Sequence, residues 1–214
     1  MKKTVSMVYI LAPLVILFFL YPFLSESAPL FIVLNGIFTI LLLLGVWKTN
    51  EKMRIFQIAL FLGLFSFACT AFLMLTTPSF LLSPYLVLLL FGSNVLFYIF
   101  CTIHLFKYIL YSKKITEDTI YGAIMVYLLI GIVWGNVYHI VETFVPGSFQ
   151  KAIPTTPMQA DFLYFSFSTL LTIGYGDITP ANSIVRSLAI IEALMGVFYI
   201  AIFISRLISN YSKE

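Results

Sequence analysis

The residues of this chain that could do chemistry are concentrated in one short run, Thr172-Ile173-Gly174-Tyr175-Gly176-Asp177. Glycine alternates with larger residues in this run, and glycine adopts backbone angles that other residues rarely reach. A strand with glycine at every second position can therefore point successive carbonyl oxygens in the same direction. Such a row of oxygens can replace the water shell of a cation. The alternative interpretation is a glycine-rich turn between two membrane helices.

The six residues TIGYGD resemble the selectivity filter of potassium channels, and residues 119–209 resemble the pore module of that family. The whole chain resembles six-span bacterial-type potassium channels, although its first four spans match only in number and hydropathy. In that family four filter strands surround one axis, and their stacked oxygen rings replace the hydration shell of a potassium ion. One strand cannot form a ring. The resemblance therefore implies a homotetramer with potassium as the permeant ion and no other cofactor.

The resemblance also implies a role for each residue of the filter. Thr172 is expected to supply a hydroxyl and a carbonyl oxygen to the innermost potassium site. The carbonyl groups of Ile173, Gly174 and Tyr175 are expected to form the rings above it. Gly176 would allow the turn at the outer mouth.

Three further residues, Tyr164, Phe165 and Asp177, are expected to support the filter. The ring of Tyr175 would pack against the preceding helix, and Asp177 would accept hydrogen bonds from behind the filter. Family members often carry two tryptophans where this chain has Tyr164 and Phe165. Tyr164 can still donate to Asp177, but Phe165 has no polar hydrogen for Tyr175. Leu171 stands where threonine is common, so inactivation at the filter is expected to differ from that of relatives.

The composition predicts an all-α membrane protein. The chain of 214 residues is 61% hydrophobic and 10% charged, with a mean hydropathy of +1.05, which is too apolar for a soluble domain. A membrane-spanning helix needs about 20 apolar residues. Six stretches meet that need, and they are residues 5–24, 30–47, 55–75, 85–106, 120–141 and 184–208.

A seventh, shorter helix is predicted between the last two spans. The sequence Thr156-Pro157-Met158-Gln159 has the form of a capping box, with proline at the first helical position. A helix from residue 157 to about residue 170 is too short to cross a bilayer, so we expect it to descend partway and return as the filter. Its negative end would then face a central cavity and favour a cation.

The distribution of basic residues predicts the orientation of the chain. With the N-terminus inside, only Lys151 and Arg186 fall on the outer side. The other basic residues fall inside, and they are Lys2, Lys3, Lys48, Lys52, Arg54, Lys107, Lys113, Lys114, Arg206 and Lys213. Both termini are therefore expected to be cytoplasmic, in the cell (inner) membrane, with lipid as the surrounding partner. Since no basic patch with interleaved aromatic residues is present, we expect no nucleic-acid partner.

The chain is expected to divide into a four-span domain, residues 1–113, and a pore domain, residues 114–214. A voltage sensor needs about 3–4 cationic residues crossing the field in each subunit. Residues 85–106 contain no lysine or arginine, so strong voltage gating is not expected. His104 and His139 could titrate near neutral pH, but structural roles are the alternative.

The last span contains a possible hinge and a possible cavity lining. Gly196 lies where related pores often have a hinge glycine, although close packing would explain a helical glycine equally well. Val197, Ile200 and Ile204 share one helix face and are expected to line the cavity, with lipid or bundle contacts as the alternative. An apolar ring at Ile204 could close the inner mouth by dewetting.

Glu192 is a carboxylate within the last predicted span. A charge at this depth is unfavourable and usually functional. We expect the side chain to face the back of the short helix near Ser168 or Thr169, either as a protonated structural donor or as a gating group.

These features favour a potassium channel that conducts passively. The alternatives are a non-selective cation channel and a subunit of a potassium transporter, and a membrane enzyme or scaffold is a more distant one. The pores of such transporters resemble four filter repeats in one chain, whereas this chain has one filter motif. No paired catalytic groups are found, so we expect no enzyme. The six residues after Ile208 are too few for a soluble ligand-binding domain.

Overall fold

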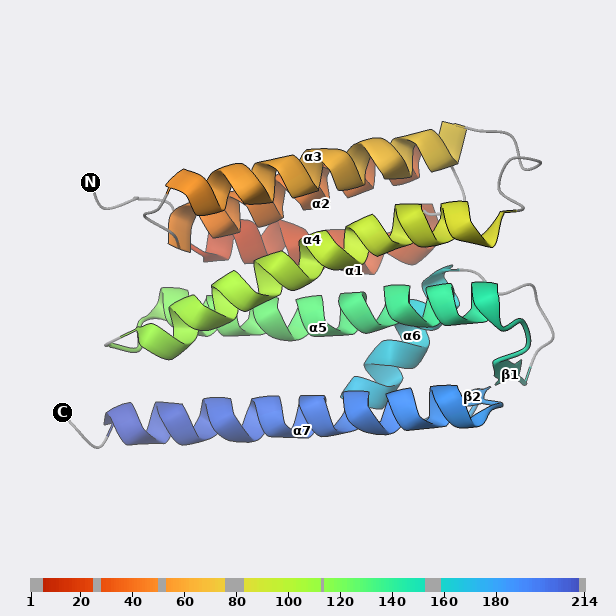
Figure 1. Ribbon diagram of the computed structural model, residues 1–214. Helices are drawn as coiled ribbons and strands as arrows, with labels where there is room; N and C mark the ends of the chain where they lie inside the picture. The colour runs from red at the N-terminus through yellow and green to blue at the C-terminus, as the bar shows by residue number, and fades with distance from the viewer. Residues whose placement is uncertain are drawn as a thin grey trace. The chain divides into compact units, whose positions relative to one another are not determined.

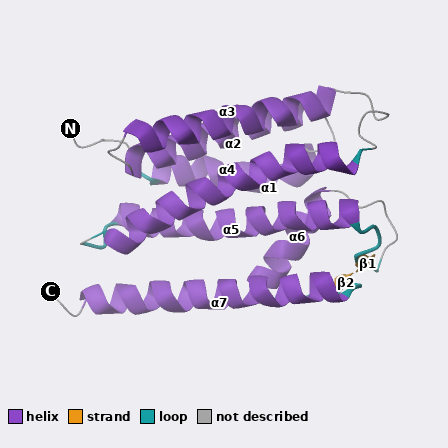
Figure 2. Cartoon of the chain, in the orientation of Figure 1, coloured by secondary structure: helices purple, strands orange, loops and turns teal. Residues whose placement is uncertain are grey.

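The computed structural model describes residues 6–24, 28–49, 53–75, 83–112, 114–152 and 159–211, and helices dominate it (Figures 1 and 2). The described elements are α1 (Val8–Leu24), α2 (Ala28–Thr49), α3 (Met53–Leu75), α4 (Pro84–Tyr111), α5 (Glu117–Phe144), β1 (Phe149–Lys151), α6 (Gln159–Leu170), β2 (Ile178–Pro180) and α7 (Ser183–Tyr211). They form two compact units, Met1–Leu129 and Ile130–Glu214, and α5 runs through the boundary. The predicted division at residues 113 and 114 stays a prediction.

Five helices are long and apolar enough to cross a membrane, namely α2, α3, α4, α5 and α7. α1 is also apolar but has only 17 residues. All six lie where the hydrophobic stretches predicted them, and several are longer than predicted. α4, for example, continues to Tyr111 because nothing before Ser112 interrupts its helical pattern.

In the first unit, α2 packs against α3 and α3 against α4. The buried side chain of Asn94 on α4 joins α3 through two polar contacts. It accepts a hydrogen bond from the Ser66 hydroxyl at 2.5 Å and donates one to the Thr70 hydroxyl at 3.0 Å. Hydrogen bonds of this kind hold apolar helices in a fixed register, because a buried polar group without a partner would be unfavourable.

Asp118, in the first turn of α5, joins three segments of the first unit. Its Oδ1 accepts hydrogen bonds from the backbone N–H of Met7 at 2.7 Å and from the Ser6 hydroxyl at 3.0 Å. Its Oδ2 forms an ion pair with Lys48 of α2 at 2.7 Å. The carboxylate therefore caps the start of α1 and neutralises a cation at the end of α2.

The second unit is built around the short helix α6. Figure 1 shows α6 running between the C-terminal part of α5 and α7. The strands β1 and β2, which flank α6 in the sequence, pair antiparallel with Phe149 opposite Pro180 and Lys151 opposite Ile178. This small sheet was not predicted, because runs of three residues carry no clear alternation. Residues 156–158 of the predicted capping box lie outside the described residues.

Aromatic side chains fill the core of the second unit. Tyr138, Phe149, Phe162, Phe165 and Val185 form one buried cluster, with ring centroids of neighbouring aromatic residues 5.0–5.6 Å apart. These residues come from α5, β1, α6 and α7. The cluster therefore ties the short helix to both long helices and to the sheet.

The three contacts of Asp118 lead to a stability prediction. Asp118→Asn keeps the shape of the side chain but removes the charge that binds Lys48 and the start of α1. We expect the free energy of unfolding to fall by about 1–2 kcal/mol, measured as a lower melting temperature in detergent micelles. Glu117→Gln, at the exposed neighbouring position, is the matched control. Equal melting temperatures for the two variants would contradict a bridging role for Asp118.

Candidate functional site

The backbone of the TIGYGD segment has a positive φ angle at every second residue. The φ angle is +57° at Thr172, +60° at Gly174 and +81° at Gly176. In a strand of uniform hand, successive carbonyl groups point in opposite directions, and inverting alternate residues brings them to one side. Glycine reaches such angles without strain, which explains the spacing of Gly174 and Gly176. Thr172 is β-branched, so its left-handed angle is strained.

Hydrogen bonds fix both ends of this segment. The carbonyl oxygen of Ser168, near the end of α6, accepts the backbone N–H of Ile173 at 2.9 Å and that of Gly174 at 3.2 Å. At the far end the carbonyl oxygen of Asp177 accepts the backbone N–H of Ala152 at 2.8 Å. The segment therefore begins against α6 and ends against the residue that follows β1.

Tyr164 on α6 contacts the segment from the side. Its ring stacks on that of Tyr175, with centroids 6.2 Å apart and planes 7° from parallel. Its hydroxyl lies on the side of the Asp177 carboxylate. One tyrosine thus faces both the aromatic residue and the acidic residue of the motif.

Phe165 faces a different direction from Tyr164, as neighbouring residues of a helix do. It is 6% exposed, and its ring lies 5.0 Å from that of Tyr138 and 5.2 Å from that of Phe149. The sequence grouped Phe165 with the filter supports. In the structure its ring contacts join α6 to α5 and β1.

Three glycines allow the long helices to approach α6 closely. A Cβ atom on Gly196 of α7 would lie 2.4 Å from the carbonyl oxygen of Leu170. On α5, a Cβ atom on Gly131 would lie 2.5 Å from the Phe167 ring, and one on Gly135 would lie 3.1 Å from Leu163 Cα. Close packing is therefore a sufficient reason for Gly196. Its use as a hinge stays a prediction.

Glu192 of α7 is fully buried behind α6. Its Oε2 accepts a hydrogen bond from the Tyr138 hydroxyl at 2.6 Å, and its Oε1 lies 2.5 Å from the Ser166 hydroxyl. The sequence predicted that this carboxyl group faces the back of the short helix, and it does. The contact on α6 is Ser166, two residues before Ser168, so the side chain reaches α6 slightly nearer its N-terminal end than the region near Ser168 or Thr169 that was predicted.

The other predicted residues of α7 lie on its surface in a single copy of the chain. Val197, Ile200 and Ile204 are 49%, 45% and 49% exposed. Their 3–4 spacing places them on one face. That they line a cavity stays a prediction.

Polar contacts at the ends of α6 and α7 were missed in the sequence. Lys151 of β1 forms an ion pair with Asp161 in the first turn of α6. Asn182 caps α7 by accepting the backbone N–H of Val185 at 2.9 Å, and it donates to the Ser148 hydroxyl at 2.8 Å. Asparagine directly before an apolar helix is a capping signal that could have been found.

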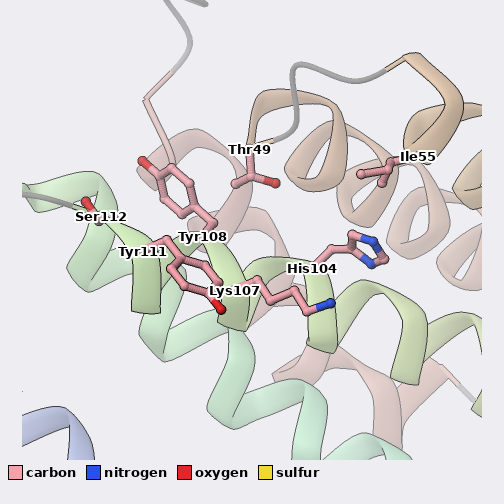
Figure 3. A pocket seen from close by; sticks show the side chains of 7 residues that line it. All are labelled: Thr49, Ile55, His104, Lys107, Tyr108, Tyr111 and Ser112. Atoms are coloured by element: carbon pink, nitrogen blue, oxygen red, sulfur yellow. The ribbon is translucent and has the colours of Figure 1, made fainter.

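The first unit has a cavity of its own, of about 400 Å³, shown in Figure 3. It is lined by Thr49, Ile55, His104, Lys107, Tyr108, Tyr111 and Ser112. The His104 ring stacks on Phe100, and its Nδ1 hydrogen-bonds the Phe100 carbonyl oxygen at 2.8 Å. This contact gives His104 a structural role. His139, in the second unit, packs its ring on Phe162 with centroids 5.3 Å apart.

The close approach at Gly196 leads to a second prediction. Gly196→Ala would place a methyl group against the Leu170 carbonyl oxygen and push α6 away from α7. We expect a loss of about 1–3 kcal/mol of stability, as in other overpacked cores. The control is Gly92→Ala in α4, where a Cβ atom would meet nothing within 4 Å. Since alanine favours helix by about 1 kcal/mol, Gly92→Ala should be neutral or stabilising. A Gly196→Ala melting temperature at or above that of the wild type would contradict the close packing.

Comparison with known proteins finds similarity between this part of the chain and ion channels. Residues 124–213 match the profile of an ion channel family. The chain is similar to Protein LctB of Geobacillus stearothermophilus, with 37% identity over 93 residues, which cover 44% of this chain and 64% of that protein. It is also similar to Two pore potassium channel c of Oryza sativa subsp. japonica, with 42% identity over 65 residues, covering 30% of this chain and 14% of that protein.

A second Protein LctB, from Bacillus caldotenax, is 28% identical over 108 residues, which cover 48% of this chain and 80% of that protein. No solved structure gives a significant match to the chain. The chain covers less than two thirds of the length of the first two of these relatives. With several helices able to cross a membrane, it is an integral membrane protein. The profile match covers the C-terminal part, residues 124–213, and it is a match to an ion channel family and not to an enzyme family.

Proposed function

We propose that the protein is a potassium-selective channel that conducts passively and has no strong voltage gating. The observation that carries this proposal is the alternation of positive φ at Thr172, Gly174 and Gly176. Such an alternation can turn successive carbonyl oxygens to one side, as a row of cation ligands requires. The similarity to a protein named as a potassium channel supports potassium as the ion.

We further propose a homotetramer, because the segment is incomplete in one copy of the chain. All residues from 171 to 177 are exposed there, including Tyr175 at 68% and Ile173 at 48%. Irregular backbone at membrane depth is tolerated only where protein buries it or where it lines a water-filled path. Four copies around an axis would satisfy both conditions. The carbonyl oxygens would line the path on the axis, and Tyr175 would be buried against a neighbouring subunit.

The supports of the filter favour potassium selectivity over non-selective conduction. Tyr164 stacks on Tyr175, so the segment is held at its outer end. Ser168 holds it at the inner end. Phe165, however, is turned into the aromatic cluster and offers the filter no hydrogen bond. This missing hydrogen bond from Phe165 to the filter is the observation that makes a non-selective cation channel the second candidate.

Orientation and gating complete the proposal. Both termini would lie on the cytoplasmic side of the cell membrane, as the basic residues predict. α4 contains one basic residue, Lys107, which lies near its C-terminal end. The electric field across the membrane therefore has little charge to move in this helix.

The test of selectivity is the reversal potential of the protein in liposomes with potassium on one side and sodium on the other. We expect reversal near the potassium equilibrium potential for the wild type. Gly174→Ala should shift it toward zero or abolish current, because a left-handed backbone angle costs an L-residue about 1–2 kcal/mol.

The chain offers a matched control for that variant. Gly147 also has a left-handed backbone (φ +81°) and open space around it, but it lies in the turn before β1. Gly147→Ala carries the same backbone strain and should keep the wild-type reversal potential. A wild-type reversal potential near zero with robust current would favour the non-selective channel.

Voltage dependence is tested by recording open probability across the same membranes. One charge crossing the field contributes about 2.3 kcal/mol per 100 mV, so a chain without such charges should change open probability less than about two-fold over 100 mV. A steep dependence would show that charges outside α4 move in the field, against the proposal.

A further inference from the structure

The three polar groups around Glu192 make more short contacts than their own hydrogens can supply. The Tyr138 hydroxyl lies 2.6 Å from Glu192 Oε2. The Ser166 hydroxyl lies 2.5 Å from Glu192 Oε1 and 2.7 Å from the carbonyl oxygen of Gly131. Oxygen atoms come this close only with a hydrogen between them. There are three contacts and two hydroxyl hydrogens.

The missing hydrogen has one available source. The Gly131 carbonyl oxygen can only accept, so the Ser166 hydroxyl donates to it. Its contact with Glu192 then requires a hydrogen on the carboxyl group. In this arrangement Glu192 donates to Ser166 through Oε1 and accepts from Tyr138 through Oε2.

The surroundings of Glu192 agree with a neutral group. Glu192, Ser166 and Tyr138 are each fully buried. The ion pairs in the described part of the chain join Lys48 to Asp118 and Lys151 to Asp161, and neither involves Glu192. The groups that face it are the Tyr138 hydroxyl from α5 and the Ser166 hydroxyl from α6. A buried carboxylate without a cation is strongly unfavourable, so protonation is the expected outcome.

We propose that Glu192 is a positioning residue, held as a carboxylic acid, that joins α5, α6 and α7 and so fixes the filter. The junction acts through α6. Ser166 lies two residues before Ser168, whose carbonyl oxygen holds the backbone of Ile173 and Gly174. A shift of α6 at Ser166 would therefore move the anchor of the segment.

The effect on the filter rests on the proposed channel function, but the protonation does not. Infrared spectroscopy of the purified protein at neutral pH tests the protonation without any ion flux. The carbonyl stretching band of a protonated carboxylic acid should be present in the wild type and lost in Glu192→Gln. Identical spectra in this band would overturn the protonated state.

Glu142 is the matched control for that spectrum. It lies on α5, outside the apolar core, and its carboxylate oxygens accept the backbone N–H groups of Gly147 and Ser148 at 2.8 and 2.9 Å. Two accepted hydrogen bonds are typical of an ionised carboxylate. Glu142→Gln should therefore leave the carboxylic acid band unchanged, and its loss in this variant would overturn the assignment of the band to Glu192.

The positioning role is tested by comparing two substitutions of Glu192. Glutamine can accept from Tyr138 and donate to Ser166, so Glu192→Gln should keep the wild-type melting temperature and ion selectivity. Alanine can do neither, so Glu192→Ala should melt earlier and lose about tenfold in potassium-over-sodium permeability, the factor expected for one strong hydrogen bond. Loss of selectivity in Glu192→Gln, or full selectivity in Glu192→Ala, would overturn the role.

A variant of the partner residue keeps the test decisive if Glu192→Ala does not fold. Ser166→Ala leaves the Tyr138 contact in place and removes only the link to α6. We expect the carboxylic acid band to remain but to shift in frequency, because the acid has lost its hydrogen-bond acceptor. We also expect reduced selectivity for potassium over sodium. An unchanged frequency and unchanged selectivity would show that Ser166 does not transmit the position of Glu192. If neither the wild type nor any variant conducts, the infrared band still tests whether Glu192 is protonated. The melting temperatures still test whether Glu192 joins the three helices.

Discussion

A chain segment that enters an apolar membrane without regular structure needs a partner for its backbone N–H groups. In the second unit the Ser168 carbonyl oxygen meets this need for Ile173 and Gly174. The carbonyl oxygens of Thr172, Ile173, Gly174 and Tyr175 are then left for another ligand. The position of the segment consequently depends on the position of α6, and much of the second unit can be understood as a means of holding this short helix.

The helix α6 is held by contacts of different physical kinds. Gly131 and Gly135 of α5 and Gly196 of α7 have no side chains, which lets the long helices approach it closely. The aromatic cluster supplies apolar contact between the same elements. Lys151 and Asp161 fix its N-terminal end, where water can reach the pair. Glycine contacts and aromatic packing are non-directional, so the directional hydrogen bonds at Glu192 are suited to set its rotation.

The sequence predicted the helices and the segment better than the contacts between them. Hydropathy located the long helices, because length and apolar composition are local properties. The spacing of Gly174 and Gly176 predicted backbone angles at alternate residues that favour glycine. It did not predict the left-handed Thr172, since threonine rarely adopts that angle. The orientation of Phe165 and the choice of Ser166 as the partner of Glu192 depend on how α6 is rotated, which no local pattern records.

We propose that four copies of this segment surround one axis with their carbonyl oxygens facing it. Electron cryomicroscopy of the purified protein in potassium is the most direct test of this arrangement. We expect four-fold symmetry, with ion density on the axis beside the carbonyl groups of Thr172, Ile173, Gly174 and Tyr175. An assembly without a four-fold axis, or one in which residues 172–176 lie away from it, would overturn the proposed arrangement.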